Sequence, residues 1–366
     1  MQRSETAIED LRVSAFKIPS DGPESDGTYR WNNTTIVLVE LIAAGQNSLG
    51  YSYTTSAAGN LIDDELKHIV IGRDALSVSA TWIALNEHVR NMGRPGIASM
   101  AISAIDTALW DLKAKLLNQP LVTLLGQVRE AMPIYASGGF TSYSEERLQD
   151  QLGNWVEQGI PRVKMKVGRD PDRDPARVAA AREAIGDDAQ LFVDANGAYS
   201  RTQALGLAYA FSEVDVSWFE EPVTSDDLAG LRAVCEDAPL GMSIAAGEYA
   251  FTVDDIRRML EAGAVDVLQV DATRCGGFTG FLQASALCEA HHVPLSSHCA
   301  PALHVHLGCS ARPFIHGEYF HDHVRIERML FDGVPEPENG ALRPDLTRSG
   351  HGLELKAGDA EQFRIL

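Results

Sequence analysis

Two lysines within one short apolar stretch are the first candidates for chemistry. Lys164 and Lys166 lie in residues 163–167, which Pro161 and Gly168 bound and which the pattern predicts to be a strand. Side chains alternate along a strand, so both ammonium groups share one face, about 7 Å apart. Either a solvated edge strand tolerates their repulsion, or the pair is buried and each lysine lowers the pKa of the other, which makes one a base.

Three carboxylates decide between these alternatives, because they follow later apolar runs at intervals of about one βα unit. Asp194, Glu220 and Glu248 each come at the end of such a run. If the runs are consecutive parallel strands, the three side chains emerge at the same end. Such a cluster needs a cation, and oxygen-only ligands favour Mg²⁺ ahead of Mn²⁺ or Ca²⁺. The alternative, that each carboxylate caps a helix, suits one residue better than three.

An Asp–His pair is predicted at two further strand ends. Asp271 follows residues 267–270 and His298 follows residues 293–297, so neighbouring strands would bring their side chains together. The carboxylate would fix the imidazole tautomer and raise its basicity. Glu318 ends the last run. His298 is singled out by its position at a strand end and not by its residue type, since a lone histidine is more often structural. We interpret the following histidines as structural: His291, His292, His304, His306, His321 and His323.

A lysine and a histidine on opposite sides of a metal suit removal of the proton next to a carboxylate. Each pKa unit between the carbon acid and its base costs about 1.4 kcal/mol, so a base alone cannot close a gap of many units. A cation must therefore stabilise the enediolate that forms.

The elements that must position these residues alternate regularly from Met132 onward. Helix-like segments separate eight short apolar runs, at residues 132–136, 163–167, 191–194, 216–220, 242–246, 266–270, 293–297 and 314–318. This pattern predicts an α/β fold of the (β/α)8 barrel type. The absence of GxGxxG and Walker A signatures disfavours a doubly wound sheet.

The region before the barrel is predicted to be an α+β unit. Two turn-rich stretches, residues 19–27 and 45–59, are expected to be loops that are either plain surface or lids over a site. The tail after Glu318 is expected to return over this first unit. In the region before the barrel, strands are expected at residues 11–18 and 35–42, and helices at residues 61–92 and 98–117.

Composition limits the partners and the compartment. The 366 residues suffice for two domains, and the net charge of −20 argues against nucleic acid and anionic membranes as partners. No apolar run is long enough to span a membrane, and the first ten residues lack the apolar core of a signal peptide. Five cysteines without metal-type spacing are expected to be reduced thiols in the cytoplasm. A nucleophilic pair of Cys299 with His298 is disfavoured.

The motifs also fall in a familiar order along nearly the whole chain. They comprise the helix Ala101–Asp111 with Pro120 to Gly126 after it, then Lys164-x-Lys166, Asp194-Ala195-Asn196, Glu220-Glu221-Pro222, Gly247-Glu248, Asp271 with Arg274-Cys275-Gly276-Gly277, Ser297-His298 and Glu318. Jointly, this order resembles the enolase superfamily, in its mandelate racemase subgroup.

The resemblance implies a (β/α)7β TIM-like barrel with an α+β capping domain. The capping domain is expected over residues 1–128, the barrel over 129–325, and a segment returning to the cap over 326–366. The loops at 19–31 and 45–59 would be the lids that determine specificity.

The resemblance further implies roles for the site residues. Lys166 and the His298–Asp271 dyad would be the two acid/base groups, Lys164 would lie near the substrate carboxylate, and Glu318 would hydrogen-bond a carboxylate oxygen. One Mg²⁺ would be held by Asp194, Glu220 and Glu248, since the first glutamate of Glu-Glu-Pro is the ligand in that family.

Two departures from the family pattern bear on the reaction. Many sugar-acid dehydratases of the subgroup carry histidine two residues after the first metal ligand, where this chain has Asn196. Arg274 stands where some relatives carry lysine, and its guanidinium is suited to a substrate hydroxyl or carboxylate. Both residues are expected to contact the substrate.

We therefore expect a Mg²⁺-dependent lyase or isomerase whose partner is a small carboxylate, and a homo-oligomer. Dehydration of a sugar acid to a 2-keto-3-deoxy acid is the leading hypothesis, and racemisation, epimerisation or cycloisomerisation with the same residues are the alternatives. A non-catalytic barrel is weaker because the acid/base set is retained. A phosphate-binding barrel is weaker because residues 298–318 lack a Gly-rich phosphate loop.

Overall fold

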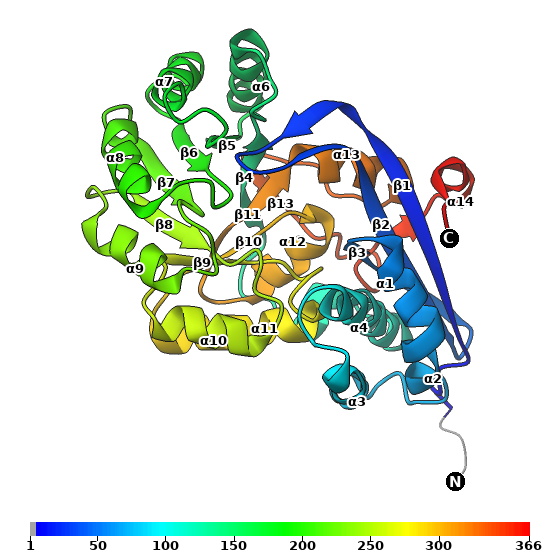
Figure 1. Cartoon of the computed structure of the whole chain (residues 1–366). Coiled ribbons are helices and arrows are strands. Elements are labelled where there is room, and N and C mark those ends of the chain that lie inside the picture. Colours follow the sequence, from blue (N-terminus) through cyan, green and yellow to red (C-terminus); the bar gives the residue numbers. More distant parts are fainter. Residues whose placement is uncertain (1–4) are drawn as a thin grey trace.

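A computed structural model describes residues 5–366, and its centre is a closed barrel of eight parallel strands (Figure 1). Each strand pairs with its neighbour in chain order, and the last pairs with the first to close the ring. The predicted barrel is therefore confirmed. Its strands are β4 Met132–Gly138, β5 Arg162–Lys166, β6 Gln190–Asp194, β7 Val216–Glu220, β8 Ser243–Ala246, β9 Val267–Val270, β10 Leu295–Ser297 and β11 Phe314–Phe320.

Seven helices alternate with these strands and cover the outside of the barrel (Figure 1). Local sequence explains where several begin: Ser200 with Gln203 and Thr252 with Asp255 form capping boxes at two of them. The helices are α6 Glu145–Glu157, α7 Asp174–Ile185, α8 Arg201–Ser212, α9 Leu228–Asp237, α10 Val253–Glu261, α11 Gly277–His291 and α12 Pro301–Ser310.

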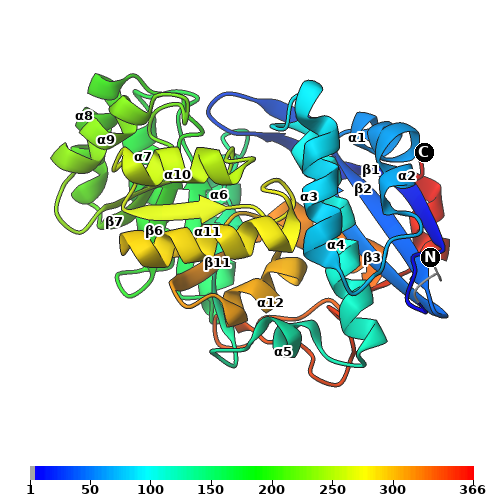
Figure 2. The ribbon, with the colours of Figure 1, turned by 90° about the horizontal axis from the view of Figure 1, so that it is seen from below.

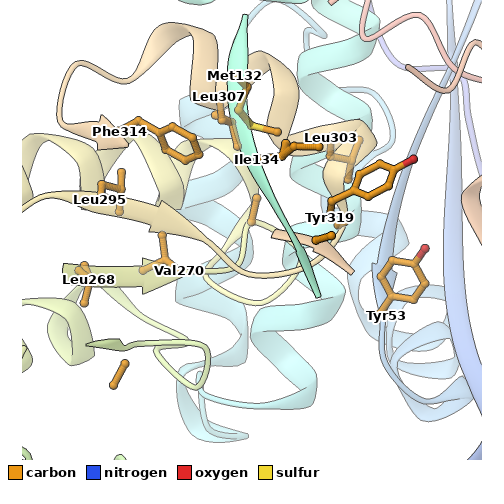
Figure 3. Packing of buried hydrophobic residues seen from close by; sticks show 14 of the residues in the cluster. Tyr53, Met132, Ile134, Leu268, Val270, Leu295, Leu303, Leu307, Phe314 and Tyr319 are labelled. Atoms are coloured by element: carbon orange, nitrogen blue, oxygen red, sulfur yellow. The ribbon is translucent and has the colours of Figure 1, made fainter. Parts of the chain in front are cut away.

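Apolar side chains fill the space between the strands and the outer helices, as Figure 3 shows for one side of the barrel. The residues there come from β4, β9, β10, β11 and α12, and they include Met132, Ile134, Leu268, Val270, Leu295, Phe314, Leu303 and Leu307. Burial of this layer leaves the strand ends free to carry polar groups.

The N-terminal unit contains an antiparallel sheet of β1 Asp10–Ser25, β2 Arg30–Ala43 and β3 Gln46–Tyr53. The loop predicted at 45–59 is wrong, because most of it is strand β3. Gly50 explains the error: an added Cβ would lie 2.3 Å from Ala104 O, so this glycine serves close packing rather than a turn. The stretch 19–31 is the far end of the β1–β2 hairpin, and only its tip is a turn.

The predicted helix over 61–92 is also wrong as a single element. It divides into α1 Ser56–Leu61, a π-helical turn at Ile62–Leu66, α2 Lys67–Val70, α3 Val78–His88 and a 3₁₀ turn at Val89–Asn91. Gly72, at φ +82°, ends the first part, and Asp74 holds the following turn by accepting the backbone N–H of Leu76. The predicted helix over 98–117 is confirmed as α4 Ile97–Leu116.

Helix α4 joins the N-terminal unit to the barrel, where it lies against β3 on one side and α11 on the other (Figure 2). Its Ser103 hydroxyl accepts the backbone N–H groups of Gly276 and Gly277 at 2.9 and 3.0 Å. Asp106 accepts the N–H and the hydroxyl of Thr279. Gly277 is required there, because an added Cβ would lie 2.4 Å from Asp106 Oδ2.

The tail after the barrel returns to both parts of the molecule. It contains α13 His321–Leu330 and α14 Ala357–Ala360, and Ile365 N–H donates to Ala15 O on β1. The remaining elements are α5 Leu121–Leu125, before the barrel, the short strands β12 Phe331–Asp332, β13 Ala341–Leu342 and β14 Glu354–Leu355, and a 3₁₀ turn at Glu361–Phe363.

The domain boundaries at 128 and 325 stay a prediction. Residues 1–4 lie outside the described residues. They belong to the first expected domain and to the ten residues that were compared with a signal peptide. Among residues 5–366, no helix combines the length and the apolar character needed to cross a membrane.

A buried carboxyl group ties β3 to the tail. The Tyr51 hydroxyl donates to Glu327 Oε1 at 2.6 Å, and the backbone N–H of Ala302 donates to Oε2 at 3.2 Å. Burial raises the pKa of Glu327 to about 8. In the unfolded chain the same group releases its proton near its ordinary pKa of about 4.3. Stability from Glu327 is therefore present at acid pH and is lost as pH rises through the folded pKa.

We predict that Glu327→Gln will reduce this loss. Between about pH 6 and about pH 9, the thermal unfolding midpoint of the native chain should fall more steeply than that of the variant, because only the native chain must ionise a buried group. Differential scanning calorimetry across this range measures the difference. Glu236→Gln, at an exposed position, is the matched control and should follow the native chain. Parallel curves for all three proteins would contradict the prediction.

Candidate active site

Lys164 and Lys166 lie at the mouth of the barrel and not on a solvated edge. Strand β5 pairs with β4 and β6, and both lysine side chains are buried. Lys164 Nζ lies 2.7 Å from both carboxylate oxygens of Glu220 and 2.8 Å from Glu318 Oε1. Lys166 forms an ion pair with Asp194. The buried alternative is therefore the one that the structure supports.

The expected mutual lowering of the lysine pKa values is wrong in this arrangement. Burial and the charge of Lys164 both lower the pKa of Lys166, but the charges of three carboxylates together outweigh them. These carboxylates are Asp194, Glu318 and Glu220. The pKa of Lys166 is thus raised above its ordinary value. The neighbouring carboxylates decide that the pKa shift is upward. The expectation drawn from residues 163–167 considered only the two lysines and not these carboxylates.

The three carboxylates meet as predicted. One oxygen from each of Asp194, Glu220 and Glu248 lies within 4.8 Å of the others. Backbone N–H of Asn196 donates to Asp194 Oδ1 at 2.8 Å, and Trp218 Nε1 donates to Glu220 Oε2 at 3.0 Å. Glu248 Oε2 is buried and accepts no hydrogen bond. An all-oxygen donor set with an unpartnered buried oxygen fits a hard divalent cation such as Mg²⁺.

The charge balance of the site supports this fit. Burial and the charge of Asp194 raise the pKa of Glu220, and burial and the charge of Glu248 raise that of Glu221. A divalent cation would relieve this repulsion. Three basic side chains face six buried carboxyl groups. The basic residues are Lys164, Lys166 and Arg274, and the acidic residues are Asp194, Glu220, Glu221, Glu248, Asp271 and Glu318.

The Asp–His pair is also formed. His298 Nδ1 lies 2.8 Å from Asp271 Oδ2, and the N–H of Thr273 donates to Asp271 Oδ1 at 2.7 Å. Burial opposes the charge of Asp271, but the hydrogen bond and charge of His298 outweigh it and hold the pKa of Asp271 well below its ordinary value. An ionised carboxylate only accepts, so Nδ1 carries the proton and Nε2 is left to exchange protons with a ligand.

A cavity of about 390 Å³ lies between the barrel mouth and the sheet of the N-terminal unit. Its barrel wall includes Lys166, Asn196, Glu248, Arg274 and His298, so half of the ten predicted site residues line it. Lys164 and Glu318 lie buried behind this wall, and Asp271 supports it through His298.

Arg274 and Asn196 reach the cavity in different states. The Arg274 guanidinium lies 3.5 Å from Glu248 Oε1 and 3.6 Å from Asp271 Oδ2, so two carboxylates offset its charge. Asn196 has a backbone φ of +47° and lines the cavity. Its buried side-chain Oδ1 has no hydrogen-bond partner among the described residues.

Two further cavity residues, His323 and Cys299, bear on interpretations made from the sequence. His323, taken as structural, lines the cavity and stacks on Tyr53 with ring centroids 3.4 Å apart. Cys299 Sγ lies 3.2 Å from His298 Nε2, so the two side chains do touch. Burial raises the pKa of the Cys299 thiol well above its ordinary value, which disfavours the thiolate that a nucleophile requires.

Two residues that support the carboxylates were missed. Trp218 and Gln269 both donate to Glu220, and Gln269 also donates to the Tyr135 hydroxyl at 2.6 Å. The signal was present, because Trp218 and Gln269 each lie two positions before a strand-end carboxylate and so share its face of the strand.

Comparison with known proteins decides the family. A family model described as enolase C-terminal domain-like matches residues 147–360, and the mandelate racemase/muconate lactonizing enzyme N-terminal domain matches residues 19–126. The chain belongs to the enolase superfamily, in its mandelate racemase subgroup.

Three members of this superfamily illustrate the likeness. A mandelate racemase/muconate lactonizing enzyme-like protein from Rubrobacter xylanophilus is 51% identical, with a TM-score of 0.96 over 98% of this chain and 100% of that one. The 3,6-anhydro-alpha-L-galactonate cycloisomerase of Streptomyces coelicolor is 33% identical over 95% of this chain and 97% of its own. L-Talarate dehydratase from Polaromonas sp. JS666, complexed with Mg and L-glucarate, is 32% identical over 98% of both chains, with a TM-score of 0.89.

We predict that this superfamily member loses Mg²⁺ affinity when a clustered carboxylate becomes an amide. Glu248→Gln and Asp194→Asn should each weaken binding by at least about tenfold, because each removes one anionic ligand. Isothermal titration calorimetry with Mg²⁺ measures the affinity, and circular dichroism verifies the fold.

The neighbouring glutamates provide a matched comparison. Glu220→Gln should weaken Mg²⁺ binding more than Glu221→Gln, because Glu220 belongs to the cluster of close oxygens and Glu221 does not. A larger loss in Glu221→Gln would show that the ligand has been assigned to the wrong glutamate.

Proposed function

We propose that this protein is a Mg²⁺-dependent enzyme that removes the proton α to the carboxylate of a sugar acid and eliminates the 3-hydroxyl to give a 2-keto-3-deoxy acid. One observation carries the proposal: two different acid/base groups, Lys166 and the His298–Asp271 dyad, line one cavity beside a cluster of three carboxylates. The Polaromonas relative, a dehydratase complexed with Mg and L-glucarate, supports the same reaction class.

The residues that would hold the cofactor are Asp194, Glu220 and Glu248. When bound there, Mg²⁺ supplies positive charge that stabilises the enediolate formed when the α-proton leaves. Lys164 adds a second positive charge behind the cluster, since its Nζ already contacts Glu220 and Glu318. Glu318 also accepts the backbone N–H of Cys299 at 2.8 Å, which fixes its position toward the substrate carboxylate.

The two acid/base groups come from strands β5 and β10, separated by four strands along the sheet, so they approach the substrate from different sides. Lys166 would take the proton from C2 as the base in its neutral form, which becomes accessible when a bound cation, rather than the lysine, offsets the charge of Asp194. His298 gives the proton on Nε2 to the 3-hydroxyl, which leaves as water when the C3–O bond breaks. The resulting enol then becomes the 2-keto acid. Asp271 stabilises the imidazolium before transfer and fixes the proton on Nδ1 afterwards.

Cycloisomerisation is the second candidate. The Streptomyces relative is a cycloisomerase, and this chain has Asn196 where many dehydratases carry an additional histidine. With one fewer proton donor, the same base and metal cluster suit rearrangement of a cyclic acid without loss of water. The expected homo-oligomer and cytoplasmic location stay predictions.

We predict that Lys166→Ala and His298→Asn will each lower kcat by at least about a hundredfold, because each removes a general acid or base. Deuterium exchange at C2 separates their roles. His298→Asn should still exchange the C2 proton in deuterated water, because Lys166 remains, whereas Lys166→Ala should not. Turnover in Lys166→Ala at the native rate would remove the lysine from the mechanism. His321→Asn, at a histidine outside the cavity, is the matched control and should keep activity.

We also predict the product. Incubation of the native enzyme with a library of sugar acids and Mg²⁺ in deuterated water should give a 2-keto-3-deoxy acid, detected by NMR. An acid that keeps all its hydroxyls and gains deuterium at an inverted C2 would indicate epimerisation. A ring-opened isomer or a lactone would indicate cycloisomerisation. Either result would replace dehydration as the reaction while keeping the metal and the base.

A further inference from the structure

The cavity has two chemically different walls. The barrel wall carries the carboxylate cluster and the acid/base groups. The second wall comes from the N-terminal unit and consists of hydroxyl, amide and aromatic side chains with a single carboxylate. Along that second wall, the described residues include no lysine and no arginine. Its members are Asp26, Thr28, Tyr29, Trp31, Asn33, Thr34, Thr35, Tyr53 and Thr54.

The second wall offers uncharged hydrogen-bonding groups. No side-chain hydrogen bond within residues 5–366 engages the hydroxyls of Thr35 and Thr54, so both are available to a ligand. Asp26 adds negative charge at the hairpin tip, where its Oδ1 accepts the backbone N–H groups of Thr28 and Tyr29 at 2.6 Å each. The hydroxyls match those of a sugar chain, and the Asp26 carboxylate repels an anion.

The cations of the barrel wall do not change this balance. Lys166 pairs with Asp194, and Arg274 lies between Glu248 and Asp271 at the level of the carboxylate cluster. Lys166 and Arg274 would therefore contact the reacting end of the substrate. The far end of the ligand faces the N-terminal unit instead.

His323 is neutral rather than a third cation. Burial and the charge of His298 hold its pKa well below its ordinary value. Its Nδ1 accepts the N–H of Ala300 at 3.3 Å, so the remaining proton is on Nε2. His323 thus presents a neutral donor, as the threonines do.

An adjoining open groove of about 770 Å³ shares Thr28, Asn196 and Tyr249 with the cavity. A longer ligand would extend into it. The arginine that lines this groove, Arg258, already forms an ion pair with Asp255. Its other lining groups include Glu221 and Asp226, so the groove offers no better place for a second anion.

We propose that the substrate is a sugar monocarboxylate, an aldonate or one of its anhydro forms, whose only charged group is the carboxylate at the reacting end. This inference rests on the proposed function and narrows its substrate class. A dicarboxylate of the same length would place its second anion against Thr35, Thr54 and Asp26. The residues that line the second wall include no lysine and no arginine to compensate for its lost hydration. Dicarboxylates are therefore excluded by charge, not by size.

The test compares pairs of sugar acids that have the same configuration and differ only at C6, such as D-gluconate with D-glucarate and D-galactonate with galactarate. Calorimetry on the Mg²⁺-loaded native enzyme gives the affinity for each, and the 2-keto acid assay gives kcat/KM. In every pair that binds, the monocarboxylate should bind at least about tenfold more tightly, which corresponds to about 1.4 kcal/mol.

Asp26→Asn tests the second wall directly. The amide keeps the Oδ1 acceptor that holds the hairpin tip, but it removes the negative charge, so the preference for the monocarboxylate should fall several-fold. Asp21→Asn makes the same change on the same hairpin outside the cavity lining and should leave the preference unchanged.

Each outcome decides the inference. Equal or tighter binding of dicarboxylates would overturn it, while their turnover would leave the proposed function standing. An unchanged preference in Asp26→Asn would also overturn it, because the second wall would then not discriminate charge. If neither member of any pair binds or reacts, the inference fails together with the proposed function.

Discussion

Six carboxyl groups are buried at the mouth of one barrel, and Coulomb repulsion among them would open this end of the fold if nothing opposed it. Lys164 and Lys166 supply part of the opposing charge, and Arg274 supplies more. Glu248 Oε2 accepts no hydrogen bond and lies 3.4 Å from His298 Nε2, so the charge balance at this oxygen is still incomplete while that imidazole is neutral. A divalent ion at this point would complete both the charge balance and the chemistry, so stability and catalysis share one electrostatic solution.

The two parts of the molecule divide the work of meeting this constraint. Parallel strands bring residues that are one βα unit apart to the same end, which concentrates charge on rigid backbone. The N-terminal unit closes over that end, so water is restricted and the charges interact strongly. Helix α4 holds the unit in place through Ser103 and Asp106, which bind the loop that follows Arg274. Its docking therefore also positions a cavity residue.

The sequence predicted the barrel and the meeting of its charged residues because both follow from spacing. Asp194, Glu220 and Glu248 needed only the βα period, and Asp271 with His298 needed only adjacent strands. Features that depend on tertiary packing were not predictable in the same way. Gly50 looked like a turn former but allows α4 to approach. The pKa of Lys166 is raised by carboxylates on other strands, first of them Asp194 on the adjacent strand β6, and no pattern within β5 contains these neighbours.

The contact of Lys164 with Glu318 joins the second strand of the barrel to the last. Because β11 must pair with β4 to complete the ring, this contact cannot form while the strands are still an open sheet. Contacts between such distant segments require the closure of a long loop and are slow to form. The active site is therefore complete only when the ring has closed. Recovery of activity after denaturation consequently reports closure of the ring, whereas recovery of helical signal alone does not.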